Sequence, residues 1–178
     1  MKPATILLLA MLGLSAALQA AVEPPDSCSE IPAAHQLDFW LGEWDVVDVS
    51  GKALGINRIE SLLGGCVVLE HWLGATGFEA RSFFYFHSWL GQWRQVWVTA
   101  HPQRPHAVKE KKLVDTFSDG GVRLQGEIMI SPENYLQDRT TLRPLPDGRV
   151  HQKIEWSNDD GKTWNTGFEG WYRRRSEP

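Results

Sequence analysis

Much of the chain beyond residue 42 alternates apolar and polar residues with a period of two, the pattern of β-strands that bury one face. The pattern is clearest in residues 122–130, where apolar side chains alternate with Arg123, Gln125 and Glu127. Segments of this kind recur at roughly ten-residue spacing, as in all-β folds. The candidate strands are residues 44–49, 55–62, 66–73, 81–87, 92–99, 107–117, 122–130, 135–142, 149–156 and 167–173.

Short turn signals separate these segments, among them Asp-Gly-Gly at 119–121 and Pro-Asp-Gly at 146–148. Short connections favour antiparallel neighbours, and closure of the sheet removes the edge strands that would otherwise aggregate. We therefore predict an all-β fold, an up-and-down antiparallel β-barrel of about ten strands. Leu37, Trp40 and Leu41 recur at helical spacing, which predicts one short helix over residues 31–41 ahead of the barrel.

Two neighbouring segments, from Phe83 to Phe86 and from Trp93 to Val98, are apolar on both faces. Successive side chains of a strand point to opposite faces, so one apolar set must lie outside the barrel. Either residues 31–41 or a second molecule would cover that outer set. We predict a homodimer through these two strands.

The N-terminus has the features of a secretory signal. Lys2 precedes an apolar run over residues 6–18, and small residues follow at Ala20 and Ala21. The run rises only about 20 Å as a helix, too short to span a membrane. Cys28 follows Asp26 and Ser27, whereas a lipoprotein signal would need small apolar residues there, so no membrane anchor is expected. We predict a signal peptide at 1–20, a linker at 21–34, a barrel domain at 35–175, and export to the periplasm or beyond.

The chain has two cysteines, Cys28 and Cys66. An exported protein with an even number of cysteines tends to pair them, so a disulfide is expected. Closing that loop would stabilise the fold by about 4 kcal/mol. The alternative is a buried free Cys66 and a Cys28 without a structural role.

The composition narrows the classes of partner. With 42% hydrophobic residues the chain is that of a folded globular protein. Without residues 1–20 it carries 17 basic and 22 acidic side chains, a net charge of −5. That charge argues against a nucleic acid or an anionic membrane as partner.

Nine tryptophans are present, and several of them share strand faces with polar residues. Trp72 lies in phase with Glu70 and Val68, and Trp97 lies in phase with Gln95. Such faces suit a cavity for a small apolar or aromatic ligand. The predicted ligand-binding residues are Trp44, Val68, Glu70, Trp72, Gln95, Trp97, Arg139, Gln152 and Ile154. The alternative is a packed barrel that acts through its surface.

Glu70 is the one carboxylate that the pattern places among apolar neighbours. Burial would raise its pKa toward that of a general acid or base, although Arg139 or Arg58 could hold it ionised. An enzyme acting on a small apolar molecule through Glu70 is therefore a further alternative. The sequence contains no other recognisable catalytic set, and we assign no catalytic residue beyond this candidate.

Several runs resemble a known family. Gly42-Glu43-Trp44 is similar to the Gly-x-Trp signature of the calycins, the lipocalin and fatty-acid-binding-protein group. The wider runs LDFWLGEWDV at 37–46, GGCVVLE at 64–70, WRQVW at 93–97 and DGRVHQ at 147–152 resemble an uncharacterised family of exported bacterial proteins beside the nitrobindin-like calycins. This resemblance covers residues 28–174 and implies a calycin-like barrel, with no established activity. It also implies a basic residue of the last strand over the signature tryptophan, and we predict Arg174 over Trp44.

Nitrobindin-like relatives bind haem through a histidine of a late strand. His151 lies on a late strand here, but it shares its face with Lys153 and Glu155, while Gln152 and Ile154 take the inner face. We therefore expect no haem and no other cofactor. The paired cysteines and the scattered histidines predict no metal site. Residues 157–164 match the Asp-box pattern, which we interpret as a structural turn.

Overall fold

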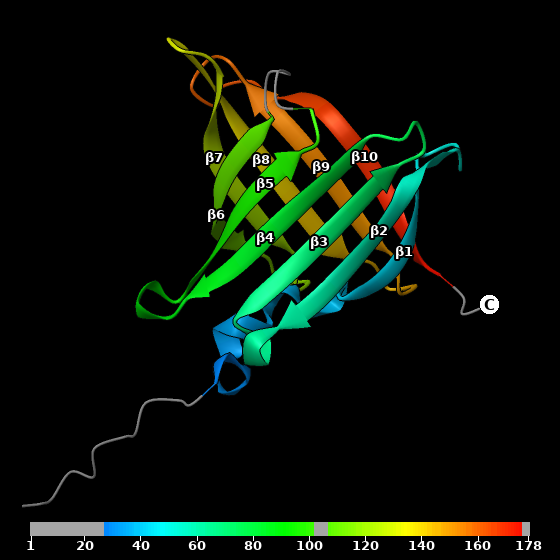
Figure 1. The fold of residues 1–178 in the computed structure, drawn as a ribbon, viewed down its shortest axis with the longest axis vertical. Helices are drawn as coiled ribbons and strands as arrows, with labels where there is room; N and C mark the ends of the chain where they lie inside the picture. Colours follow the sequence, from blue (N-terminus) through cyan, green and yellow to red (C-terminus); the bar gives the residue numbers. More distant parts are fainter. Residues whose placement is uncertain (1–26, 102–106, 176–178) are drawn as a thin grey trace, which may run out of the picture.

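A computed structural model describes residues 27–101 and 107–175 of the chain. Ten antiparallel strands close into a barrel in which each strand pairs with the next and β1 pairs with β10, as predicted (Figure 1). The strands are β1 (Gly42–Val47), β2 (Ala53–Leu62), β3 (Val67–Gly74), β4 (Glu79–His87), β5 (Gln92–Thr99), β6 (Val108–Thr116), β7 (Val122–Ser131), β8 (Asn134–Pro144), β9 (Val150–Ser157) and β10 (Asn165–Arg174). The predicted signal peptide lies outside the described residues.

Short 3₁₀ helices lead into the barrel and connect its first strands. They are η1 (Cys28–Glu30), η2 (Pro32–Trp40), η3 (Leu63–Gly65) and η4 (Ser88–Leu90). With three residues per turn, η2 places Ala34, Leu37 and Trp40 on one buried face. Residues 28–34, predicted as part of a linker, instead form η1 and the start of η2, because this apolar face closes one end of the barrel (Figure 1).

Cys28 and Cys66 form the predicted disulfide, with their Cα atoms 5.0 Å apart. The bond ties η1 to the connection between β2 and β3 that contains η3. Such bonds persist in oxidising compartments, so the disulfide is compatible with export. Among the helices of the described ranges, none has the length and apolar character needed to cross a membrane.

Large aromatic side chains fill the interior next to η2. Trp40, Trp44 and Trp93 are fully buried, and the indole nitrogen of Trp44 donates to the carbonyl of Trp40 at 2.8 Å. The guanidinium of Arg174 lies 4.3 Å from the Trp44 ring centre and donates to the carbonyl of Leu41 at 2.7 Å, which confirms the predicted stacking.

The same contact of Arg174 requires a glycine at position 42. Its φ of +123° is rarely adopted by other residues, and a Cβ there would collide with the guanidinium of Arg174. The Gly-x-Trp spacing therefore lets Arg174 reach Trp44 past a bare backbone.

The outer face of β4 and β5 stays apolar in the folded chain. Phe84 points into the core, whereas Phe83 and Val98 are 46% and 44% exposed on the outside. The η2 helix packs at the end of the barrel and leaves this face open (Figure 1). Residues 31–41, which could have covered this face, do not do so in the described chain. The homodimer through this face stays a prediction.

Candidate ligand site

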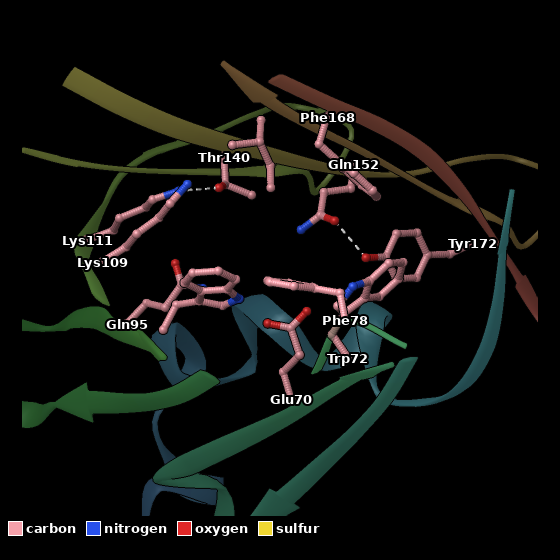
Figure 2. A pocket seen from close by; sticks show the side chains of 12 residues that line it. Glu70, Trp72, Phe78, Gln95, Lys109, Lys111, Thr140, Gln152, Phe168 and Tyr172 are labelled. Atoms are coloured by element: carbon pink, nitrogen blue, oxygen red, sulfur yellow. Dashed lines mark hydrogen bonds between the residues drawn. The ribbon is translucent and has the colours of Figure 1, made fainter. Parts of the chain in front are cut away.

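A pocket of about 200 Å³ lies inside the barrel, in the half that η2 does not fill (Figure 2). Side chains from six strands and from the β3–β4 turn converge on it. Its walls are Glu70, Trp72, Phe78, Gln95, Trp97, Lys109, Lys111, Thr140, Gln152, Ile154, Phe168 and Tyr172.

Two aromatic pairs form the apolar walls. Phe78 of the β3–β4 turn stacks on Trp97 of β5, with ring centres 6.2 Å apart and an interplanar angle of 28°. Trp72 of β3 meets Phe168 of β10 edge to face at 5.8 Å. These rings offer flat apolar surfaces of the kind that bind aromatic ligands.

Glu70 sits at the base of the pocket, only 6% exposed, and its carboxylate points toward the centre (Figure 2). The pairing of β3 with β4 sets Ser82 opposite Glu70, and the Ser82 hydroxyl donates to Oε2 at 2.5 Å. Asn57 of β2 donates to Oε1 at 2.8 Å. Burial raises the pKa of Glu70, and the hydrogen bonds from Ser82 and Asn57 only partly offset that effect.

A second part of the network runs to β10. The amide of Asn57 also donates to the Tyr172 hydroxyl at 3.2 Å, and that hydroxyl donates to Oε1 of Gln152 at 2.6 Å. Burial, reinforced by the charge of Glu70, raises the pKa of Tyr172 well above its ordinary value of 10.0. The phenol therefore stays neutral, and the network presents neutral donors and one carboxyl group to the pocket.

Two lysines enter the pocket from the opposite side (Figure 2). The side chain of Lys111 is 3% exposed; its Nζ pairs with Asp138 and donates to Thr140 Oγ1 at 2.6 Å. Lys109 donates to Oδ2 of the same Asp138 at 2.8 Å, and its Nζ lies 5.5 Å from the centre of the Trp97 ring. A single buried carboxylate thus holds two ammonium groups together.

Burial lowers the pKa of Lys111 to about 8, an effect that the charge of Asp138 opposes. Burial also disfavours the charged form of Asp138, but the charges of Lys111 and Lys109 outweigh it and lower the pKa of that carboxyl. Lys111 and Asp138 are therefore mainly charged at neutral pH.

Six of the nine predicted ligand-binding residues line the pocket: Glu70, Trp72, Gln95, Trp97, Gln152 and Ile154. Trp44 and Val68 are instead packed in the core. The inward placement of Arg139 is wrong, because Thr140 takes the inner face of β8.

Outside the barrel Arg139 donates to Glu155 at 2.7 Å and stacks on Trp164 at 3.9 Å. Arg58 likewise pairs on the exterior, with Glu60 at 2.9 Å. Neither arginine therefore holds Glu70 ionised, although the sequence alone left Arg139 and Arg58 open as its partners.

The lysines were missed because residues 108–116 read VKEKKLVDT, which is polar on both faces. Alternation could not tell which face turns inward. The sequence signal that could have identified the inner face is Leu113, an apolar residue in phase with both lysines. Leu113 is buried in the structure. Strand pairing resolves the ambiguity, since Gln95 faces Lys111 and Trp97 faces Lys109.

The other candidate features lie away from the pocket. His151 faces outward, as its phase predicts, and pairs with Glu169 at 2.9 Å. In the Asp-box, Asp159 accepts a hydrogen bond from the Thr163 backbone at 2.9 Å, and Trp164 donates to the Gly161 carbonyl at 2.9 Å, which makes it a structural turn. The described residues include no group of three or more histidines, cysteines or acids placed to hold a metal ion.

Glu70→Gln is expected to gain stability relative to the wild type as the pH rises. The pKa of Glu70 in the folded protein lies above its ordinary value of 4.5, so the folded state holds this proton to a higher pH than the unfolded chain does. The cost of the buried charge therefore appears as the pH rises from 4.5 through the folded pKa, with a slope of at most about 1.4 kcal/mol per pH unit. The amide does not incur this cost.

Urea unfolding of both proteins from about pH 4 to about pH 8 measures the difference in the free energy of unfolding. Glu133→Gln, at an exposed position, is the control and should leave the difference flat with pH. A flat difference for Glu70→Gln as well would contradict the raised pKa.

The sequence was compared with protein-family models and with curated proteins, and it matches none of them. The residues of the pocket are therefore the basis on which a ligand is inferred.

Proposed function

We propose that this chain is an exported barrel that binds one small apolar or aromatic molecule. The observation that carries the proposal is the pocket between Trp72, Trp97 and Phe168, a space inside the barrel that the side chains do not fill. Apolar walls with a few oriented polar groups are the general design of small-molecule sites. A packed barrel acting through its surface would have no need of such a space.

The size of the pocket limits the ligand. Drug-sized ligands occupy pockets of roughly 300 Å³ or more, whereas an apolar cavity of roughly 150 Å³ holds a benzene molecule. A pocket of about 200 Å³ therefore suits one ring, or two fused rings with a small substituent. Long-chain lipids would not fit without rearrangement of the walls.

Export and membership of the calycin group belong to the same proposal. The Cys28–Cys66 disulfide supports export, since such bonds are rare where thiols are kept reduced. Closure of ten strands and the stacking of Arg174 on Trp44 support the calycin likeness.

Titration with indole and with 2-naphthol tests the binding. Either compound should quench or shift the fluorescence of Trp72 and Trp97 and raise the melting temperature, because a ligand that binds only the folded state stabilises it. At a ligand concentration of about one hundred times Kd the gain is about 2.7 kcal/mol. Unchanged fluorescence and melting temperature across one- and two-ring compounds would contradict the proposal.

Ile154→Trp is expected to abolish this binding by filling the pocket. Ile154 is a half-buried wall residue, so the larger side chain takes the space of the ligand while burying more apolar area. Val114→Trp, on the exposed face of β6, is the matched control and should bind as the wild type does. Calorimetric titration distinguishes the two variants; equal affinity would place the ligand elsewhere.

A further inference from the structure

The two lysines have more hydrogen-bond donors than they use in hydrogen bonds to the described chain. Each ammonium group carries three N–H donors and no acceptor. Lys111 uses Asp138 and Thr140, and Lys109 uses Asp138. Half of the six donors therefore make no hydrogen bond to a described side chain, at a place where the lysines line the pocket.

The charges at this end of the pocket are also unbalanced. Lys109 and Lys111 contact the two oxygens of one carboxylate, which leaves one positive charge in excess. Asp138 is buried and does not line the pocket, whereas both lysines do, so an anion can approach this net charge from the pocket side. Buried charges are normally paired, and one further anion on the pocket side would complete an arrangement of two ammonium groups and two carboxylates.

Aromatic surface adjoins this cationic end. The pairing of β5 with β6 sets Trp97 opposite Lys109, and Phe78 stacks on the same indole. Nζ of Lys109 lies 5.5 Å from the centre of the Trp97 ring, so a ring placed beside Trp97 would have this ammonium group near it. Lysines serve as point-charge partners for anions without a fixed planar geometry, which suits a small mobile ligand.

We propose that the ligand is a small aromatic carboxylate, with its ring against Trp97 and its carboxylate accepting hydrogen bonds from Lys109 and Lys111. This inference rests on the proposed function and names its class of ligand. Glu70 faces the pocket from the other side, held by Asn57 and Ser82, and its burial favours the uncharged acid. Neither lysine is among the hydrogen-bond partners of Glu70, so their free donors stay available to an anion.

Calorimetric titration of matched pairs tests the inference. Benzoate is compared with benzamide, and 2-naphthoate with 2-naphthamide, since each pair shares its shape and differs in charge. The carboxylate is expected to bind about tenfold tighter or more, as charge-assisted hydrogen bonds are stronger than neutral ones. Benzylamine is included because a cationic ligand paired with Glu70 is the opposite arrangement.

Variants then test which residues cause the preference for a carboxylate over an amide. Lys109→Met keeps the length of the side chain and removes its charge, while Asp138 keeps Lys111 as partner. It should weaken carboxylate binding about tenfold and amide binding less, and retained amide binding shows that the pocket is intact. Lys112→Met, an exposed neighbour on the outer face, is the control and should keep the preference.

The outcomes separate the two proposals. If amides bind as tightly as carboxylates, if benzylamine binds tightest, or if Lys109→Met keeps the full preference, the carboxylate assignment is overturned and the binding barrel stands. If no member of the panel binds at all, both proposals fail together.

Discussion

Replacing Asp138 by Asn is expected to lower the free energy of unfolding by about 3–5 kcal/mol at neutral pH, the usual cost of removing one partner of a buried ion pair. Lys111 has 3% of its side chain exposed and donates otherwise only to the Thr140 hydroxyl, so its charge would remain buried without a carboxylate. Lys109 would lose the same partner but is more exposed, at 17%. The effect should therefore come mainly from Lys111.

The deficit of Asp138→Asn should shrink as the pH rises. The pKa of Lys111 is already lowered in the wild type, to about 8, and loss of the Asp138 charge removes an effect that raises it. A base with a lowered folded pKa costs stability while it is charged, and the cost is relieved as the pH rises through that pKa toward the unfolded value of 10.5. Urea unfolding at about pH 7 and about pH 9 measures both the deficit and its relief.

Asp115→Asn is the matched control for this variant, since Asp115 lies exposed on β6, the strand of the two lysines. Its effect should stay within about 0.5 kcal/mol. An Asp138→Asn protein as stable as the wild type, or a deficit that grows with pH, would show that the buried lysine does not depend on this carboxylate.

Loss of the Cys28–Cys66 disulfide is expected to cost about 4 kcal/mol. The cysteines are 38 positions apart, and opening this loop returns its closure entropy to the unfolded chain. The double variant Cys28→Ser, Cys66→Ser and the reduced wild type should unfold at similarly lowered urea concentrations.

Reductant supplies the control for the disulfide, because it should have no effect on the double serine variant. The bond also anchors η1, so Leu37 and Trp40 of the following helix would lose part of their support at the end of the barrel. If the oxidised wild type and the serine variant unfold at the same urea concentration, the bond contributes nothing to stability and only positions η1.

The strands, their order and the disulfide could be read from the sequence, because each depends on a local or countable property. Period-two alternation marks β7 and the turns mark its ends, while two cysteines leave only one possible pairing. Glu70 was found for a similar reason, since its neighbours on the same face are apolar. The helix also followed from spacing, although its 3₁₀ geometry brings Ala34 rather than Leu41 to the buried face.

The ligand site needed the tertiary structure. In β6 both faces are polar, so alternation could not show that Lys109 and Lys111 point inward, and in β8 it did not separate Arg139 outside from Thr140 inside. Those choices are made by the register of the closed barrel, which sets Lys111 across from Gln95 and brings Asp138 from two strands away to both lysines. A buried and charged lysine is stabilised by a carboxylate that pairs with it. The contact of Asp138 with the two lysines joins strands that are distant in the sequence, so local patterning cannot predict it.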